Sequence, residues 1–171
     1  SHEGASVIER SFSDRDTHSR ALFSECGAYR YALTRRWGRG RRLTLVLLNP
    51  STADERRNDP TVARCEVRAR ALGFGAFRVT NLFAFRATDP RDLKRALDPV
   101  GPDNDAILER SADWADTVLC GWGLHGAHLG RGPAVEARLR QRARDLCHLG
   151  LTGTGAPRHP LYVAYRVMPV P

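Results

Sequence analysis

The most apolar run in the chain, Leu43–Leu48, ends abruptly at Asn49-Pro50-Ser51 and passes into a polar loop. The run is too short to span a membrane, and its composition is typical of a buried strand. In α/β proteins a central strand that ends in a polar loop commonly places functional groups at its carboxyl end. We therefore expect the chemistry of this protein to lie around Asn49.

The pattern of apolar residues along the rest of the chain indicates strands that alternate with helices. We expect a strand over 28–37, paired in a β-hairpin with 42–48 through a glycine-containing turn at 38–40. The further expected elements are a helix over 59–72, a strand over 76–83, helices over 91–97 and 103–113, a strand over 117–120, a helix containing Val135, Leu139, Ala143 and Leu146, and a loop over 158–163 that feeds a last strand. This alternation predicts a parallel or mixed sheet that is covered on both faces.

Length and composition are typical of one soluble domain. The chain has 171 residues, of which 42% are hydrophobic and 27% are charged, enough to bury a sizeable core. Residues 1–20 are polar and lack a clear period, so we interpret 1–27 as an N-terminal extension, partly disordered, and 28–171 as the domain. No apolar segment follows a basic start, so nothing in the sequence indicates secretion.

The net charge of +8 and the isoelectric point near 10.1 favour a polyanionic partner. We expect nucleic acid, DNA rather than RNA, and no membrane. Arginines 138, 140, 142 and 144 on one helix are the expected phosphate-tracking face. The alternative is a soluble protein that is basic without having a polyanionic partner.

The four cysteines, Cys26, Cys65, Cys120 and Cys147, form no Cys-x-x-Cys pair, which argues against a structural zinc site. All except Cys26 lie in apolar surroundings and are expected to be core residues. An iron–sulfur cluster is the alternative, and a reducing cytoplasm is the simpler interpretation. The loop histidines His125 and His128 are alternative metal ligands, but no nearby carboxylate or cysteine completes a site. We therefore expect neither a metal nor a cofactor.

Polar or flexible residues follow each expected core strand by the same short step. Asn49, Asn81, Gly121 and His159 would lie on one rim if the strands are parallel. Asn49 offers an uncharged amide that can position a water, or it can act as a turn former. Asn81 lies inside an apolar run and must have its amide paired, either to a neighbouring loop or to a ligand such as a pyrimidine edge. His159, held by Pro160, can donate a hydrogen bond to a leaving group, or it can be a surface histidine in a turn.

Several common catalytic motifs are absent from the sequence. There is no Gly-x-Ser-x-Gly elbow, no phosphate-binding Gly-x-x-x-x-Gly-Lys loop and no Rossmann glycine triplet. These absences disfavour triad hydrolases, nucleoside triphosphatases and dehydrogenases. The loop carboxylates Asp54, Asp59 and Asp89 can act as bases, but Asp-Pro at 59–60 and 89–90 is also typical of a helix start.

Four sequence blocks together resemble a bacterial family known as domain of unknown function 1643. They are Leu-Asn-Pro-Ser-Thr-Ala-Asp at 48–54, Val-Thr-Asn-Leu-Phe-Ala-Phe-Arg-Ala-Thr-Asp-Pro at 79–90, Gly-Trp-Gly-x-His-Gly at 121–126 and Pro-Arg-His-Pro-Leu-Tyr at 157–162. The resemblance covers about residues 28–171, and the family name implies no activity.

The order of the blocks also resembles, more loosely, the uracil-DNA glycosylase superfamily. That resemblance implies a three-layer α/β/α sandwich with a mostly parallel sheet and a site at the strand ends. It implies that Asn49 orients the attacking water and Asn81 binds the flipped base. His159 would stabilise the departing base from a loop that enters the minor groove together with Pro160. Such a protein would be a monofunctional glycosylase without metal, and we expect it to be a monomer.

The chain departs from that superfamily at Ser51, where Gly or Tyr is common, and at Leu161-Tyr162, where a serine-containing continuation is usual. These differences leave three alternatives open: a glycosylase for another lesion, an enzyme acting on nucleosides or nucleotides, and a non-catalytic nucleic-acid binder. The residues expected at the site are Asn49 and His159 for catalysis; Asn81, Pro50, Phe83 and Phe85 for base binding; and Ser51, Thr52, Arg86, Arg158, Pro160 and Tyr162 for nucleic-acid contact.

Overall fold

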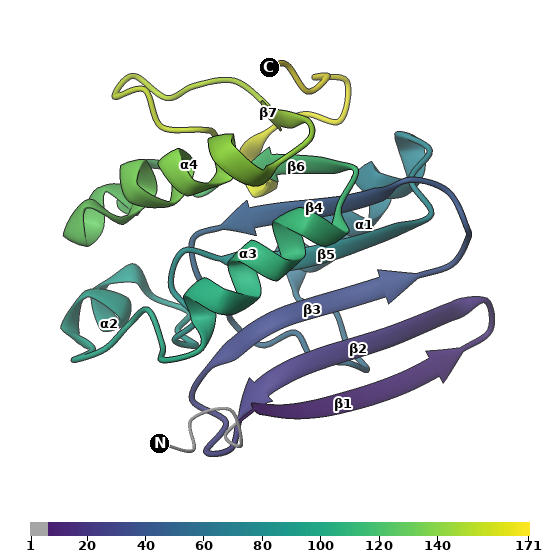
Figure 1. The fold of residues 1–171 in the computed structure, drawn as a ribbon, viewed down its shortest axis with the longest axis horizontal. Helices are drawn as coiled ribbons and strands as arrows, with labels where there is room; N and C mark the ends of the chain where they lie inside the picture. Colours follow the sequence, from purple (N-terminus) through teal and green to yellow (C-terminus); the bar gives the residue numbers. More distant parts are fainter. Residues whose placement is uncertain (1–6) are drawn as a thin grey trace.

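A computed structural model, which describes residues 7–171, shows a mixed α/β fold built on one seven-stranded sheet (Figure 1). The strands are β1 (Val7–Asp14), β2 (Thr17–Ser24), β3 (Arg30–Arg36), β4 (Arg42–Leu47), β5 (Ala76–Asn81), β6 (Thr117–Cys120) and β7 (Leu146–His148). The helices are α1 (Pro60–Ala71), α2 (Pro90–Arg95), α3 (Asn104–Trp114) and α4 (Arg131–Arg142), with 3₁₀ segments at Leu124–Gly130 and Pro160–Tyr162.

The sheet has the strand order β1-β2-β3-β5-β4-β6-β7. Its β5-β4-β6-β7 part is parallel throughout, whereas β1, β2, β3 and β5 pair antiparallel. The expectation of a mostly parallel sheet is therefore wrong, and the sheet is mixed. The physical reason is that three strands precede β4 and are joined to the sheet without any helical crossover, which only antiparallel pairing allows.

The predicted β-hairpin between 28–37 and 42–48 does not form, because β5 lies between β3 and β4. Val79 of β5 is opposite Leu33 on one side and Leu45 on the other. The turn at 38–40 crosses the start of β5 instead: the N–H groups of Trp37 and Gly38 both donate to the Gly75 carbonyl at 3.0 Å. A Cβ on Gly75 would lie 2.4 Å from a backbone nitrogen of this turn, so only glycine permits the crossing.

The segment expected to be an N-terminal extension belongs to the sheet. β1 and β2 form an antiparallel pair, and β2 continues onto β3. Ala21 and Phe23 of β2 are buried in the core, but most of β1 is exposed on both faces. This exposure explains why its sequence lacks the apolar alternation of a half-buried strand. The expectation for residues 1–6 lies outside the described residues.

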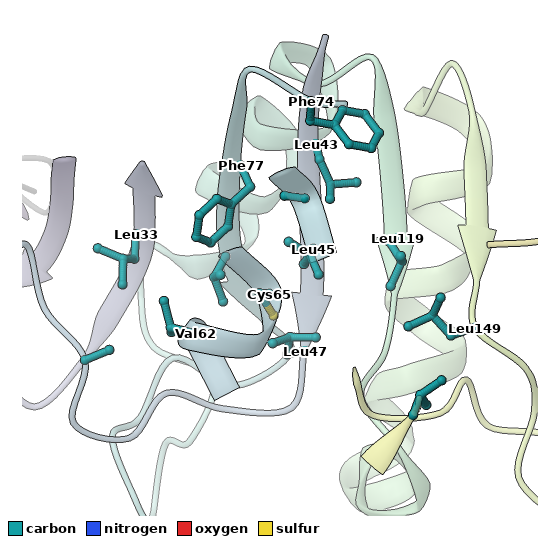
Figure 2. Packing of buried hydrophobic residues seen from close by; sticks show 14 of the residues in the cluster. Leu33, Leu43, Leu45, Leu47, Val62, Cys65, Phe74, Phe77, Leu119 and Leu149 are labelled. Atoms are coloured by element: carbon teal, nitrogen blue, oxygen red, sulfur yellow. The ribbon is translucent and has the colours of Figure 1, made fainter. Parts of the chain in front are cut away.

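Helices pack against both faces of the parallel strands, each with its own apolar cluster. Figure 2 shows the cluster on the α1 side, where Val62 and Cys65 of α1 meet Leu43, Leu45 and Leu47 of β4. On the opposite face, α3 and α4 pack on β4 and β6. α1 begins as the sequence predicted: the Asp59 side chain accepts from the Val62 N–H at 2.9 Å and a proline follows.

The end of the chain differs from the sequence prediction in two ways. α4 ends at Arg142, and Leu146, expected on that helix, instead begins β7 beside β6. The segment 158–163, expected to be a loop that feeds a last strand, contains the 3₁₀ turn Pro160–Tyr162, and no strand follows it in the described residues. The carbonyls of Pro160 and Val163, which a strand would use in the sheet, accept hydrogen bonds from Arg64 of α1 at 3.3 and 2.6 Å. Hydrogen bonds from the Arg64 side chain thus take the place of strand pairing in this segment.

All four cysteines are free thiols, and Cys65, Cys120 and Cys147 are buried, as expected for small core residues. Burial raises the pKa of each of these three thiols to about 12. Over the described residues, no helix is both long and apolar enough to cross a membrane.

Candidate functional site

The connections of the parallel strands leave β4 and β6 in opposite directions. The chain passes from β4 through α1 to β5 on one side, and from β6 through α4 to β7 on the other. Such a reversal between adjacent strands opens a crevice at their carboxyl ends, the usual ligand site of open α/β sheets. We use the name crevice for the corresponding region here, between the loop that starts at Leu48 and the Gly121-Trp122-Gly123 segment.

The segment 158–160 lies over this crevice because Gly121 leaves room for it. A Cβ at Gly121 would lie 2.9 Å from Pro160 Cδ and 3.1 Å from the carbonyl oxygen of Arg158. Gly123 fixes the approach, since its N–H donates to the Pro157 carbonyl at 2.8 Å. The two sequence blocks at 121–126 and 157–162 therefore pack against each other in the structure.

His159 caps the turn that follows it. Its Nδ1 accepts from the Leu161 N–H at 3.3 Å, which leaves the proton of a neutral ring on Nε2. Burial lowers the pKa of His159 to about 4, although the charge of Asp59 acts in the opposite direction. The imidazole is therefore neutral at pH 7 and is a hydrogen-bond donor through Nε2.

Two arginines of α1 hold the His159 turn against the helix. Arg64 binds the Pro160 and Val163 carbonyls, as described above, and Arg68 donates to the carbonyls of Val163 at 2.8 Å and Val167 at 3.2 Å. Arg68 is buried, and its Nε has no hydrogen-bond partner among the described residues. These arginines act as positioning residues for His159 and do not themselves enter the crevice.

Asn49 follows β4 and has its amide oriented by two carbonyl groups. Its Nδ2 donates to the carbonyl oxygens of Ala87 at 2.7 Å and Pro50 at 3.0 Å. Since only the NH₂ group can face two acceptors, Oδ1 points the other way, and no donor from the described part of the chain reaches it. Asn49 thus joins two loops and keeps one free acceptor, and its role in positioning a water stays a prediction.

Asn81 is the last residue of β5 and is only 1% exposed, on the same face as Phe77 and Val79. It is in register with Leu47 of β4, and its Oδ1 is buried without a partner within the described chain. From the opposite face, Asn104 Nδ2 donates to the Asn81 carbonyl at 3.0 Å and so fixes the end of the strand. A buried amide oxygen without a donor is costly and commonly marks a place where a ligand or water binds.

Arg30 is a second buried polar residue at this edge, and the sequence analysis missed it. Its guanidinium donates through Nη1 to the Ala53 carbonyl at 3.1 Å, but its buried Nε has no partner in residues 7–171. A register shift between Leu22 and Phe23 places Arg30 opposite Phe23, on the α1 face. Burial lowers its pKa to about 10, and Asp59 opposes this shift. The only sequence signal was an arginine at the start of an apolar strand.

The aromatic residues expected to stack on a base are packed inside the protein. Phe83 is fully buried, and its ring lies 5.6 Å from that of His128. Phe85 is half-buried and meets the Tyr29 ring edge-on at 6.0 Å. Phe83 therefore has no free face for a base, which corrects its predicted role.

The other residues predicted to contact nucleic acid fall into two groups. Ser51 and Thr88 share a hydroxyl hydrogen bond of 3.0 Å, and Arg86 donates to the Ser51 carbonyl at 3.3 Å, so these residues tie loops together. The exposed residues are Thr52, Arg158 and Tyr162, whereas Pro50 and Pro160 are buried.

The arginine face predicted to track phosphates is occupied by acidic partners. Arg138 lies within 3.6 Å of Asp105 and Glu109, and Arg142 binds Asp113 at 2.6 Å. Arg140 pairs with Glu136 at 2.7 Å and Arg144 with Asp116 at 3.6 Å. The pairs of Arg138 and Arg142 join α4 to α3, that of Arg140 lies along α4, and that of Arg144 joins the segments just beyond the two helices. The face predicted to track phosphates therefore carries little free positive charge.

The crevice is closed in this structure. The largest of the cavities described, about 310 Å³, lies next to it at the ends of β6 and β7. Its polar lining comes from Glu136, Arg140 and His148. Neither this cavity nor the cavities of about 220 and 170 Å³ elsewhere is lined by Asn49, Asn81 or His159. The three predicted residues thus lie at one sheet edge without a described cavity between them.

Comparison with protein families gives one match, to the family described as proteins of unknown function (DUF1643), over residues 30–161. The chain belongs to this family. The match confirms the family predicted from the four sequence blocks and includes Asn49, Asn81, Gly121 and His159. No curated protein and no solved structure matches the chain. The relationship to uracil-DNA glycosylases therefore stays a prediction.

Proposed function

We propose that the protein binds DNA and hydrolyses the N-glycosidic bond of a flipped or modified base at the β4–β6 crevice. The observation that carries the proposal is the state of His159: a neutral imidazole that is fixed through Nδ1 and can donate only through Nε2. A base that leaves a sugar carries the electron pair of the broken bond on its ring nitrogen and carbonyl oxygens. A fixed neutral donor in a poorly solvated place stabilises such an anion more in the transition state than in the ground state.

Asn49 would orient the attacking water. Its free Oδ1 accepts a hydrogen bond from water, and its Nδ2 is held by the Ala87 carbonyl at 2.7 Å, so the acceptor direction is fixed. Asn81 would bind the base edge, because its unpartnered Oδ1 is an acceptor for a ring N–H. Neither amide is ionised, so this assignment needs no charged base.

The proposed step balances as a simple hydrolysis. The water oxygen forms a bond to the sugar C1′ as the bond from C1′ to the base nitrogen breaks. The electron pair of that bond goes to the base, and the proton lost by the water completes the free base. His159 donates a hydrogen bond throughout and is unchanged at the end.

Access to the site requires the His159 turn to move. The turn lies directly on Gly121 and fills the crevice that a base would occupy. Its anchors on α1, Arg64 and Arg68, bind carbonyls that follow His159. The segment before the histidine is held by backbone hydrogen bonds from Gly123 N–H to the Pro157 carbonyl at 2.8 Å and from Arg158 N–H to the Gly150 carbonyl at 2.9 Å, which must break for the turn to shift. Extruding a base from duplex DNA costs a few kcal/mol, which phosphate contacts must offset.

The test is an abasic-site assay on duplexes that carry uracil, hypoxanthine or hydroxymethyluracil. We expect cleavage after alkali with the wild-type protein, and loss of it in Asn49→Ala. His125→Ala, which changes a half-buried histidine outside the crevice, is the matched control and should keep the activity. If no duplex yields abasic sites above the Asn49→Ala level, the enzymatic proposal is wrong. DNA binding that survives both substitutions would then favour the non-catalytic binder.

A second candidate function, an enzyme acting on free nucleosides or nucleotides, is favoured by the cavity of about 310 Å³ beside the crevice. Its volume is at the lower end of the range of small-molecule sites, and His148 and Arg140 offer donors. A thermal-shift panel of bases, nucleosides and nucleotides tests it, with DNA as the competing ligand. Stabilisation by a nucleoside together with weak DNA binding would favour this function over base excision.

The helices on both faces of β4 and β6 agree with the α/β/α arrangement that we propose for the parallel half. A monomer located in the cytoplasm and acting without a metal or cofactor completes the proposal.

A further inference from the structure

The face of the sheet that bears α3 carries a row of alternating hydroxyl and guanidinium groups. In register across five strands lie Ser11 of β1, Arg20 of β2, Thr34 of β3, Arg78 of β5 and Thr44 of β4. Neighbouring strands are about 4.8 Å apart, so the two arginines stand about 10 Å apart on the same face. α3 contacts β3, β4 and β5, and in Figure 1 no helix lies in front of β1 and β2. The row is therefore covered at one end and open at the other.

Arg78 forms the fixed centre of this row. Its Nε donates to Thr34 Oγ1 at 2.8 Å and its Nη1 to Ser111 Oγ of α3 at 3.2 Å. The guanidinium also lies 4.2 Å from the centre of the Trp114 ring, and Arg42 stacks on the same ring at 5.1 Å. Hydroxyls and an aromatic ring thus hold two arginines in place without neutralising them.

The charges around Arg78 are all of one sign. Burial lowers the pKa of Arg78 to about 10, and the charges of Arg20, Arg42 and Arg110 act in the same direction. Within residues 7–171, no ion pair involves Arg78, Arg42 or Arg110, and the pair between Arg20 and Glu9 is long, at 3.8 Å. The carboxylate of Asp116, which binds the Arg42 backbone N–H at 2.9 Å, is shared with Arg144.

α3 separates its charges between two sides. Asp105, Glu109 and Asp113 meet the arginines of α4, whereas Arg110 is exposed and has no such pair within the described chain. Four arginines that lie close together with few carboxylates beside them repel one another, and an anionic partner removes that cost. The hydroxyls of Thr34 and Thr44 are used inside the protein, so the groups left for such a partner are the guanidinium groups at the open end of the row and on α3.

We propose that this arginine row, defined by Arg20, Arg42, Arg78 and Arg110, is a docking surface for the phosphate backbone of DNA. The row is separate from the crevice and binds without reading the bases, because it offers positive charge and the ring of Trp114 is already covered by two guanidinium groups. The choice of DNA as the polyanion rests on the proposed function. That the surface binds a polyanion is inferred from the arginine row alone.

The test measures the salt dependence of binding to a fluorescent duplex of about 20 base pairs between about 50 and 200 mM KCl. Each phosphate contact contributes about 0.9 to the slope of log K against log salt. The double variant Arg20→Gln/Arg110→Gln, which leaves the packed Arg78 in place, should reduce the slope by roughly 1.8 and weaken binding at the lowest salt by about tenfold or more.

The matched control is Arg138→Gln/Arg142→Gln, which also removes two arginines but from ion pairs between α4 and α3. Its slope should equal that of the wild type. An unchanged slope in the first variant, an equal loss in both variants, or displacement of DNA by millimolar inorganic phosphate would overturn the proposal. DNA binding that depends on Arg20 and Arg110 but yields no abasic sites would retain this surface and reject base excision, so the two failures are distinguishable.

Discussion

The two halves of the sheet differ in what covers them and therefore in what they can do. The parallel half, β5-β4-β6-β7, is packed by helices on both faces and exposes its functional groups only at the strand ends. In the antiparallel half, β1 and β2 keep one face free of helices, with polar side chains pointing out of it, whereas β3 is partly covered by α3 (Figure 1). Chemistry that needs exclusion of water suits the first half, and attachment to a long charged partner suits the second. The composition of the strands distinguishes the two halves: the strands of the parallel half are apolar, and in the antiparallel half only β3 is.

The strongest test of this division is His159→Ala. Removing one positioned hydrogen-bond donor typically lowers a rate by about 100- to 1000-fold. Binding to DNA should stay unchanged, because the arginines of the row lie on the α3 face of the sheet or on α3 itself and not among the residues at the strand-end crevice. Single-turnover excision and anisotropy on the same protein check both values. A variant that loses binding along with activity would show that the crevice and the row do not act separately.

The next test concerns the contact between Gly121 and Pro160. Gly121→Ala forces a methyl group to 2.9 Å from Pro160 Cδ, so the turn must shift. We expect a loss of about 1–3 kcal/mol in the free energy of unfolding and a displaced His159. Gly153→Ala, where nothing lies within 4 Å of the added Cβ, is the control and should change stability little. Urea unfolding of both variants measures the difference, and equal stabilities would contradict the close approach.

The pH dependence of stability tests the buried state of His159. The pKa is about 4 in the folded protein, below the ordinary value of 6.5, so the unfolded chain binds the proton more readily. This stabilisation is complete above pH 6.5 and is lost as the pH falls towards 4. We expect the wild type to lose about 2 kcal/mol more than His159→Gln between about pH 7 and pH 4.5. Equal losses in urea unfolding at the two pH values would show that the imidazole is solvated.

The smallest expected effect lies on the open face. Arg20→Gln removes an exposed side chain whose one ion pair is 3.8 Å long. The free energy of unfolding should change by less than about 0.5 kcal/mol, because such pairs contribute little. Thermal melting of the variant measures this change. A large loss of stability would indicate that the arginine row serves the fold instead of a partner.

The elements that bury one regular face were predictable from sequence. The helix that starts at Asp59 and the strand 117–120 agree with the expectation, because a cap or an apolar run specifies them locally. Which strands pair was not predictable: β5 enters between β3 and β4 although they are neighbours in the chain. Pairing depends on contacts far apart in sequence, and alternation alone carries no information about the neighbour.

The residues at the strand ends of the candidate site were predictable from the sequence, whereas its buried residues were not. Asn49 and Asn81 lie at the ends of β4 and β5, and the contact of 158–160 with Gly121 brings His159 to the same edge. Arg30 was missed because a register shift changes the face on which it lies, and Phe83 is packed in the core because its run continues inward. The pairing of Arg138 and Arg142 was not predictable, because the acidic residues that pair with them lie on another helix.

The position of His159 in the chain has a consequence for how each molecule is made. Gly121 and α1, against which its turn packs, leave the ribosome earlier than the histidine does. A nascent chain that has reached residue 150 contains all seven strands and the full arginine row, but no imidazole at the crevice. A new molecule would thus contain its polyanion-binding surface before its proposed catalytic histidine. Stalled or prematurely terminated chains would bind the polyanion but have no activity.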